Sequence, residues 1–363
     1  MQKNILILFT NYGTGHYMAA KAIYEHLINK YPNYNIKIMD PLSFSRPLIN
    51  KICSKIGKLF ATKFRKLRKY FYQKHMYQNY LKYSWFYTFF TTLFWNKKLE
   101  EKIINFNPKI IISTQAGPTC LIATHKHLFK SKLVSVFTDY SIHRAYTLPH
   151  KNIDIYCVPN KEIKKQMIKL GIKKSKISIT GIPVHQQFML KTNKQNKKSK
   201  PLFLFICGGG LGYKNAFKYF KNLLEINDNF SYIFVAGKNK KLKEKAAKLA
   251  KKYNKQGHII GYTTNMDKLM FISDMIIGKP GGIITSESLN TTIPICAVEA
   301  IPGQETYNAL FIEKNNFGFN VKNKTDFKLL LNKILTKKIN LKEYQKNIEN
   351  NFDKFNFINI DKI

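Results

Sequence analysis

The sequence predicts an α/β protein made of two Rossmann-like halves, each with a doubly wound parallel sheet. Short β-branched runs alternate with amphipathic helical stretches along most of the chain, which is typical of repeated βα units. The alternation stops at residues 191–200, KTNKQNKKSK, which contain no hydrophobic side chain and are typical of a solvated linker, and then it resumes. At 363 residues, of which 44% are hydrophobic, the chain is long enough to bury two cores.

The first half is expected to form one parallel sheet. Its β-branched runs predict strands at 4–9, 35–39, 109–113, 133–138 and 153–158, and an amphipathic stretch predicts a helix at 15–30. A basic, aromatic insertion from about residue 42 to 98 interrupts this order. The insertion is too apolar for a linker and too basic to be buried throughout.

The second half repeats the pattern after the linker. Strands are predicted at 202–207, 232–236, 258–261, 275–278 and 294–298, and helices at about 215–225, 240–253 and 283–290. The predicted domains are therefore 1–190, which contains the insertion, and 201–340, joined by the linker 191–200 and followed by a helical tail at 341–363. A ligand is expected at the carboxyl ends of the strands, in a cleft between the two halves.

The segment NYGTGH (residues 11–16) follows the first predicted strand and opens the first helix. Its glycines, Gly15 among them, let the backbone turn tightly and approach a ligand, and the amino end of a helix favours negative charge. The third glycine of the dinucleotide fingerprint is missing, so an NAD site is disfavoured. His16 is placed for proton transfer or for bonding an acceptor hydroxyl; a histidine that only caps or packs is the alternative.

Two glycine-rich segments of the second half also follow predicted strands. In CGGGLG (207–212), the glycines Gly208, Gly209 and Gly210 leave N–H groups bare for a diphosphate or another oxyanion, although an ordinary glycine turn has the same composition. In GKPGGIITSESL (278–289), a strand-to-helix turn leaves room for a ligand. That turn consists of Pro280, Gly281 and Gly282.

Carboxylates and an amide follow the second of these turns. Glu287, next to Ser286, can accept both hydroxyls of a ribose, because a carboxylate has two oxygens; the alternative is that it only complements the helix dipole. Gln304 and Glu305 stand one βα loop later, where side chains reach the same crevice. An amide beside a carboxylate suits the hydroxyls of a hexose.

Composition excludes several other classes of protein. The five cysteines are scattered singly, so neither a disulfide framework nor a metal site is expected, and a reducing cytoplasm fits best. No apolar stretch is long enough to span a membrane, and the apolar run at the amino terminus is too short for a signal peptide.

The net charge of +40 comes from 57 lysines against 4 arginines. A base composition that favours lysine codons accounts for part of this excess, but acids are absent between Asp40 and Glu100, where residues 46–98 carry 13 Lys/Arg and 15 aromatic residues. Such a field attracts a nucleic acid or an anionic lipid surface. Lysine dominance favours the lipid surface, because base-edge readout favours arginine.

The insertion has the pattern of an amphipathic helix on an anionic bilayer, with aromatic residues at headgroup level. A helical hairpin of the core with a solvated lysine face is the alternative. The predicted membrane-binding residues are Lys51, Lys55, Lys58, Phe60, Lys63, Phe64, Lys66, Trp85 and Trp95.

Three segments together resemble a known family: YGTGH (12–16), FTDYSIHRAY (137–146) and GKPGGIITSESLNTTIPICAVEAIPGQE (278–305). They look like the diacylglycerol glycosyltransferases, which comprise bacterial processive glucosyltransferases and plant monogalactosyldiacylglycerol synthases. The resemblance covers most of the chain and is weakest in the insertion. It implies a GT-B fold, two Rossmann-like domains facing a central cleft, with a lipid acceptor in the first domain and a UDP-sugar in the second.

The resemblance also implies roles for single residues. His16 matches a histidine proposed as general base, and Asp139 matches an acid that orients this histidine or shares its role. Glu287 matches a ribose-binding glutamate, while Gln304 and Glu305 match a pair that holds the donor hexose. The full set of predicted donor-binding residues is Gly15, Gly208, Gly209, Gly210, Ile260, Pro280, Gly281, Gly282, Ser286, Glu287, Gln304 and Glu305.

The predicted function is inverting, metal-independent transfer of a hexose, with glucose preferred, from a UDP-sugar to the hydroxyl of 1,2-diacylglycerol. Repeated transfer is left open, no cofactor is expected, and the enzyme is expected to bind peripherally at the cytoplasmic face of the membrane. Alternatives are N-acetylglucosamine transfer to another lipid-linked acceptor, a UDP-N-acetylglucosamine 2-epimerase, and a basic nucleic-acid-binding protein. The insertion argues against the epimerase. The glycine-rich segments argue against the nucleic-acid-binding protein, so no nucleic acid partner is expected.

Overall fold

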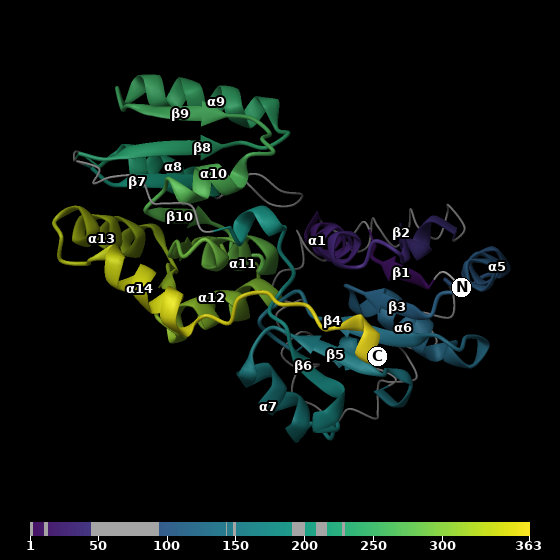
Figure 1. The fold of residues 1–363 in the computed structure, drawn as a ribbon. Coiled ribbons are helices and arrows are strands. Elements are labelled where there is room, and N and C mark those ends of the chain that lie inside the picture. The colour runs from purple at the N-terminus through teal and green to yellow at the C-terminus, as the bar shows by residue number, and fades with distance from the viewer. Residues whose placement is uncertain are drawn as a thin grey trace. The chain divides into compact units, whose positions relative to one another are not determined.

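The computed structural model describes residues 3–10, 14–44, 94–142, 144–147, 150–190, 200–207, 216–226 and 229–363. The chain divides into unit 1, Met1–Gln186 with Asp353–Ile363, and unit 2, Gln187–Phe352. Each unit contains one six-stranded parallel sheet with helices against it, so the predicted α/β class is confirmed (Figure 1).

The sheet of unit 1 has the strand order β2-β1-β3-β4-β5-β6, and all of its strand pairs are parallel. Its strands are β1 (Asn4–Leu8), β2 (Asn35–Met39), β3 (Ile110–Ser113), β4 (Lys132–Val136), β5 (Ile155–Val158) and β6 (Ile177–Ile179). Its α-helices are α1 (Thr14–Lys30), α5 (Lys97–Phe106), α6 (Ala116–Thr124) and α7 (Lys161–Lys169). Short 3₁₀ helices include η1 (Pro41–Phe44), η2 (Lys126–Leu128), η3 (Arg144–Thr147), η4 (His150–Asn152), η5 (Lys174–Lys176) and η7 (Ile360–Lys362).

The side chains of these strands pack alternately against two layers of helices, because successive residues of a strand point to opposite faces of the sheet. Leu6, Leu8 and Ile111 pack with buried residues of α5, α6 and α7 in one cluster. Helix α1 contacts β1 and β2 and buries its own apolar stripe, which includes Ile23 and Leu27. Unit 1 is therefore a three-layer sandwich with its sheet in the middle.

The sheet of unit 2 has the order β12-β11-β10-β7-β8-β9, again with parallel pairs only. Its strands are β7 (Leu202–Ile206), β8 (Ser231–Val235), β9 (Gly257–Ile260), β10 (Met275–Gly278), β11 (Ile295–Ala297) and β12 (Gly318–Asn320). Its α-helices are α8 (Ala216–Leu224), α9 (Lys240–Lys252), α10 (Met266–Phe271), α11 (Gly282–Asn290), α12 (Gln304–Lys314), α13 (Lys324–Leu335) and α14 (Leu341–Asn351). The 3₁₀ helix η6 (Gln186–Phe188) precedes this sheet in the chain.

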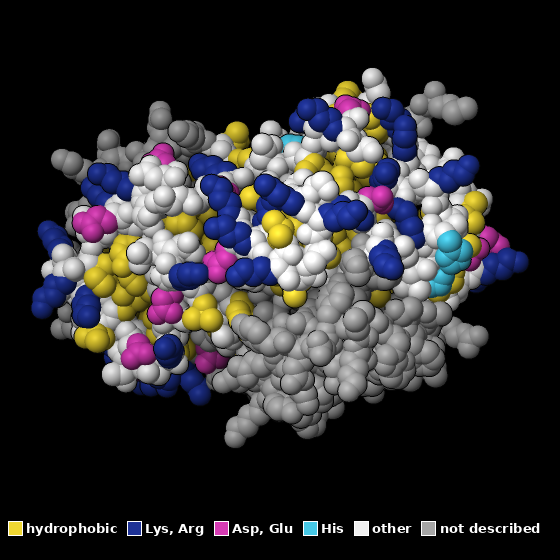
Figure 2. Space-filling model, turned by 90° about the horizontal axis from the view of Figure 1, so that it is seen from below, with side chains coloured by type: hydrophobic (Ala, Val, Ile, Leu, Met, Phe, Trp, Pro, Cys, Tyr) yellow, Lys and Arg dark blue, Asp and Glu magenta, His cyan; other side chains and the backbone are white. Residues whose placement is uncertain are grey.

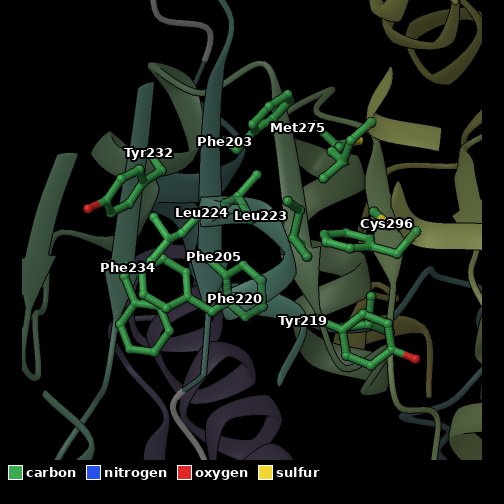
Figure 3. Packing of buried hydrophobic residues seen from close by; sticks show 14 of the residues in the cluster. Phe203, Phe205, Tyr219, Phe220, Leu223, Leu224, Tyr232, Phe234, Met275 and Cys296 are labelled. Atoms are coloured by element: carbon green, nitrogen blue, oxygen red, sulfur yellow. The ribbon is translucent and has the colours of Figure 1, made fainter. Parts of the chain in front are cut away.

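One face of the unit 2 sheet carries an aromatic core (Figure 3). The rings of Phe220 on α8 and Phe234 on β8 lie 4.4 Å apart between centroids, and Phe205 on β7 lies 5.5 Å from Phe220. All three side chains are fully buried. Rings of this size bury large apolar areas, so this cluster supplies much of the hydrophobic stabilisation of unit 2.

Each sheet reverses its strand order once, and the reversal marks where a ligand fits. In unit 1 the order turns between β1 and β3, and in unit 2 it turns between β7 and β10. Loops leave the carboxyl ends of two such neighbouring strands in opposite directions, so a crevice opens between them. The residues after β1 and β3, and those after β7 and β10, are therefore the ones to inspect.

The end of the chain differs from a single helical tail. Helix α14 covers only the first part of 341–363, and the residues from Asp353 onward belong to unit 1. The Asn356 N–H donates to the Thr180 carbonyl at 2.9 Å, and Phe355 and Phe357 are buried. Two apolar rings thus hold the terminal segment on unit 1, and their spacing is that of an extended strand, not of a helix.

Several predicted features lie outside the described residues. These are most of the insertion at 42–98, the linker residues 191–199 and the membrane-binding candidates Lys51, Lys55, Lys58, Phe60, Lys63, Phe64, Lys66 and Trp85. Among the helices that are described, none combines the length and the apolar character needed to cross a bilayer.

Gly318 supports a stability prediction. It begins β12 at φ +156°, pairs with Ile295, and a Cβ placed on it would overlap the Ile295 carbonyl oxygen and come within 2.8 Å of the Ile295 nitrogen. Gly318→Ala should therefore lower the free energy of unfolding by about 2 kcal/mol or more, measured by urea denaturation.

Gly117→Ala is the matched control, because a Cβ there has nothing within 4 Å and the residue lies in α6. That substitution should raise the free energy of unfolding by about 0.5–1 kcal/mol. Equal urea midpoints for the two variants would contradict the close approach of β11 to Gly318.

Candidate active site

His16 lies in the first turn of α1, at the point where the sheet of unit 1 reverses its strand order. Its Nδ1 is 3.0 Å from the carbonyl oxygen of Thr114, directly after β3, and 3.0 Å from Oγ1 of Thr138, after β4. The Thr114 hydroxyl donates to the His16 carbonyl at 3.0 Å. The imidazole is thus attached to the carboxyl ends of two neighbouring strands.

The contact with Thr114 determines which nitrogen of His16 carries the proton. A carbonyl oxygen can only accept a hydrogen bond, so Nδ1 must donate, and in a neutral ring Nε2 then holds the lone pair. Burial lowers the pKa of His16 to about 4, and the hydrogen bond to Thr114 opposes this only in part. At neutral pH the ring is therefore uncharged and able to accept a proton at Nε2.

Two residues outside the predicted set, Thr138 and Tyr146, contact this histidine directly or through one hydroxyl. Thr138 Oγ1 lies 3.1 Å from the Tyr146 hydroxyl, which in turn donates to the Thr114 carbonyl at 3.4 Å. Both side chains are buried. The segment FTDYSIHRAY was recognised as informative, but Asp139, which is half-buried beside Thr138, was the residue chosen from it. Its predicted role in orienting His16 stays a prediction.

Gln115 holds the loop after β1 against the end of β3. Its Oε1 accepts hydrogen bonds from the backbone N–H of Thr10, at 3.0 Å, and from the Thr10 hydroxyl. Residues 11–13 of the NYGTGH segment lie outside the described residues, while Gly15 lies in α1. The entrance to α1 is therefore tied to β3 on both sides of the glycine-rich segment.

In unit 2 the turn after β10 also lies at the reversal point of the sheet. Gly281 caps α11, which begins at Gly282, and the Pro280 carbonyl accepts a hydrogen bond from Asn308 Nδ2 at 3.0 Å. Asn308 is fully buried on α12. An amide from a neighbouring helix thus fixes the turn so that the amino end of α11 faces the crevice, where an anion is favoured.

Glu287 lies inside this helix with 8% of its surface exposed. Burial raises the pKa of its carboxyl to about 8, so the group is largely protonated at neutral pH when no ligand is bound. The neighbouring Ser286 hydroxyl donates to the Gly282 carbonyl at 2.8 Å. A buried carboxyl without solvent is a group that hydroxyls of a ligand can stabilise as the anion.

Lys279 and Glu305 form an ion pair that the sequence analysis missed. Lys279 Nζ lies 3.2 Å from Glu305 Oε1, and the other carboxylate oxygen accepts from the Ile301 N–H at 2.8 Å. The Lys279 side chain is 12% exposed. It also lies close enough to Cys207 for its charge to lower the pKa of that thiol, which burial raises to about 12. Positive charge therefore lies beside Cys207, the first residue of the CGGGLG segment.

The remaining predicted site residues are less informative. Gln304 begins α12 next to Glu305, and the Ile260 carbonyl, at the end of β9, accepts from the Ala236 N–H at 2.9 Å. Gly208, Gly209 and Gly210 lie outside the described residues. Donor binding by all of these residues stays a prediction.

Trp95 is the one predicted membrane-binding residue that the structure describes. Its ring stacks on His125 with 3.9 Å between centroids and an interplanar angle of 6°. Its Nε1 donates to Glu100 at 3.0 Å. The indole is therefore fixed within unit 1 by stacking and a hydrogen bond, and its part in membrane binding stays a prediction.

Possible metal ligands are dispersed. Within the described part of the chain, His, Cys, Asp and Glu side chains form no group of three that could hold a metal ion. The ionisable groups at the two reversal points are instead His16 in unit 1 and Glu287, Lys279 and Glu305 in unit 2.

Comparison with known proteins confirms the resemblance and the fold. A family profile for monogalactosyldiacylglycerol (MGDG) synthase matches residues 16–184. Among solved structures, MurG of Acinetobacter baumannii superposes with a TM-score of 0.61 and 12% identity, covering 97% of this chain and 96% of that chain. The predicted GT-B fold is therefore confirmed.

Curated relatives are similar over nearly the whole chain. A processive diacylglycerol beta-glucosyltransferase of Bacillus licheniformis is 28% identical over 363 residues, which cover 96% of this chain and 90% of that protein. A protein of the same name from Staphylococcus epidermidis is 30% identical over 325 residues, 87% of this chain and 80% of that protein. At this identity and coverage, the chain belongs to the diacylglycerol glycosyltransferase family, together with the processive diacylglycerol beta-glucosyltransferases.

Proposed function

We propose that the protein transfers glucose from UDP-glucose to the hydroxyl of 1,2-diacylglycerol and inverts the anomeric centre. The observation that carries this proposal is the geometry of His16, whose Nδ1 proton is directed at Thr114 so that the lone pair lies on Nε2. Relatives named diacylglycerol beta-glucosyltransferases support the choice of diacylglycerol as the acceptor and of glucose as the transferred sugar. Unit 2 binds the donor, and unit 1 binds the acceptor and supplies the base.

The reaction is a single displacement. The acceptor oxygen attacks C1 of glucose while its proton moves to Nε2 of His16, and the bond between C1 and the diphosphate oxygen breaks. The electron pair of that bond leaves with UDP. One base is sufficient, because no covalent intermediate with the protein forms and attack from the opposite side inverts C1.

The leaving diphosphate gains negative charge as the bond breaks, and groups fixed in advance stabilise it best. The amino end of α11, at Gly281 and Gly282, is directed to the reversal point of the sheet, and Lys279 adds a positive charge there. We assign the charge stabilisation to these groups and to the segment 208–212. The proposed reaction needs neither a divalent metal nor an organic cofactor.

The acceptor lies in a membrane, so the enzyme works peripherally at the cytoplasmic face of the bilayer. Lys and Arg side chains are spread over the described part of the face shown in Figure 2, with fewer Asp and Glu among them. A net charge of +40 favours anionic lipids, each lysine near the surface contributing about 1 kcal/mol. We propose anionic lipids, and not a nucleic acid, as the partner of this surface.

His16→Ala should slow transfer strongly without affecting donor binding. The rate should fall by a factor on the order of 10²–10⁴, the usual contribution of a general base. The measurement is radiolabel transfer from UDP-glucose, and separately from UDP-galactose, to diacylglycerol in anionic and neutral vesicles with EDTA present. Chromatography of the lipid product counts the sugars added per lipid. With the wild type at saturating donor, kcat should stay level at neutral pH and fall only as the pH approaches about 4, where His16 becomes protonated.

His127→Ala is the matched control, since this histidine lies on the surface of unit 1. It should retain full activity. If neither sugar reaches the lipid in either vesicle, the diacylglycerol reaction is rejected, and other lipid acceptors are the next to test. A requirement for metal would appear as activity that EDTA removes.

Glu287→Gln should weaken UDP binding and at the same time stabilise the protein. Burial raises the pKa of this carboxyl to about 8. Since UDP is proposed to bind the Glu287 anion, UDP should bind more tightly as the pH rises toward 8. Loss of the charged acceptor should weaken binding by about tenfold to a hundredfold and remove this pH dependence. Calorimetry at several pH values measures both effects.

The same substitution should stabilise the folded protein at high pH, although it weakens UDP binding there. Because the pKa in the folded protein lies above that in the unfolded chain, Glu287 lowers stability progressively as pH rises from the unfolded value toward about 8. Glu287→Gln should therefore raise Tm at pH 8 and change it little at low pH. Glu349→Gln, an exposed position on α14, should change neither quantity. A Tm gain equal at both pH values would refute the assigned burial effect.

A further inference from the structure

The hydroxyls of Thr138 and Tyr146 form a chain of polar side chains that connects to the His16 ring nitrogen Nδ1. Thr138 follows β4 and contacts the His16 ring. Tyr146 lies in η3 and donates to the Thr114 carbonyl, which also binds that ring. We infer that Thr138 and Tyr146 are positioning residues that hold the His16 ring in one orientation, while the Thr114 carbonyl sets its tautomer. This inference rests on the proposed function only for its effect on rate.

The direction of each hydrogen bond follows from the carbonyl at the end of the chain. Because Thr114 O only accepts, the Nδ1 proton and the Tyr146 hydroxyl proton both turn toward it. Tyr146 oxygen is then available to accept from the Thr138 hydroxyl, whose own oxygen faces the Nδ1 proton of His16. This arrangement of protons satisfies these four contacts together.

The reversed tautomer would break the same network. With the proton on Nε2, the lone pair of Nδ1 would face the Thr114 carbonyl oxygen at 3.0 Å, so two acceptors would oppose each other. Thr138 would have to donate to Nδ1 and would lose its donation to Tyr146. In a buried site an unpaired acceptor is costly, because no water replaces the lost partner.

The network is also rigid. Thr114 is 0%, Thr138 3% and Tyr146 2% exposed. The ring of Tyr146 stacks on Phe137, with 4.7 Å between centroids and an interplanar angle of 25°. Packing therefore fixes the Tyr146 hydroxyl without help from His16, which is the property required of a group that positions another.

The consequence for catalysis is a preorganised lone pair. A ring held at Nδ1 by two oxygens cannot flip about its last side-chain bond, so Nε2 keeps one direction. A general base must lie within hydrogen-bond reach of the proton that it removes, and a small misplacement slows the step. Loss of Thr138 or Tyr146 should therefore reduce kcat and leave donor binding in unit 2 unchanged.

The test uses Thr138→Val, Thr138→Ser and Tyr146→Phe in the full chain with ¹⁵N-labelled histidine. NMR of the imidazole nitrogens reports the tautomer directly, and His16→Ala identifies the His16 signals. Every variant should keep the proton on Nδ1, because the Thr114 carbonyl is unchanged. The wild type and Thr138→Ser should show narrow His16 signals, since serine keeps the hydroxyl. Thr138→Val should show signals broadened by a ring that samples more than one orientation, and Tyr146→Phe a smaller change in the same direction.

The kinetic readout separates positioning from packing. Thr138→Val should lower kcat by about five- to tenfold, the value of one hydrogen bond, with an unchanged KM for UDP-glucose, and Thr138→Ser should restore kcat to within about twofold. The double variant Thr138→Val/Tyr146→Phe should be little worse than Thr138→Val, because the two act in series. Thr336→Val and Tyr344→Phe, which lie in unit 2, are the matched controls.

Wild-type line widths of the His16 signals in Thr138→Val and Tyr146→Phe would overturn the inference, whatever the effect on Tm. Lower kcat in both variants with wild-type line widths would assign them a purely structural role and overturn it equally. If the wild type itself transfers no sugar to diacylglycerol, the proposed function fails, but the NMR result still decides whether the network holds the ring in one orientation.

Discussion

The hydrogen bond from Nδ1 of His16 to the Thr114 carbonyl is the contact on which the chemistry of unit 1 depends. A carbonyl oxygen has no proton to give, so this single bond determines the tautomer and the direction of the remaining lone pair. The bond exists because β1 and β3 are neighbours at the reversal point of the sheet. Strand order therefore places the end of β3 against the first turn of α1, although about a hundred residues separate them in sequence.

Local patterns predicted the elements but not the contacts between them. Hydrophobic runs of five residues were sufficient for β1, β7 and β8, whereas β6 and β12, at three residues each, are too short for any periodic pattern. Glycines marked the turn at Gly281 correctly as a helix start, because a strand followed by glycines and a helical run is a local signal. The buried Asn308 that fixes this turn comes from the next helix, and no local signal joins it to Pro280.

The same limit applies to the candidate site. Residue type and position after a glycine-rich turn drew attention to His16 and Glu287, and the family resemblance drew attention to Asp139, whereas Thr138 and Tyr146 are types that usually only pack or cap. Their importance arises from a closed set of hydrogen bonds among three elements, which no spacing along the chain reveals. Lys279 was missed for another reason. It is one of 57 lysines in the sequence, and only its burial beside Glu305 distinguishes it from the others.

His16 and Glu287 show one physical rule with opposite signs. Burial disfavours the charged form of each, so it lowers the pKa of the histidine to about 4 and raises that of the carboxyl to about 8. Both groups are thus uncharged at neutral pH without a ligand, and folding avoids two unpaired buried charges. Under the proposed function the substrates allow each group to become charged. Ribose hydroxyls stabilise the Glu287 anion, and the acceptor hydroxyl supplies the proton for His16. Each of these two groups therefore becomes charged only when its own substrate is bound, which couples the chemistry to the presence of both substrates.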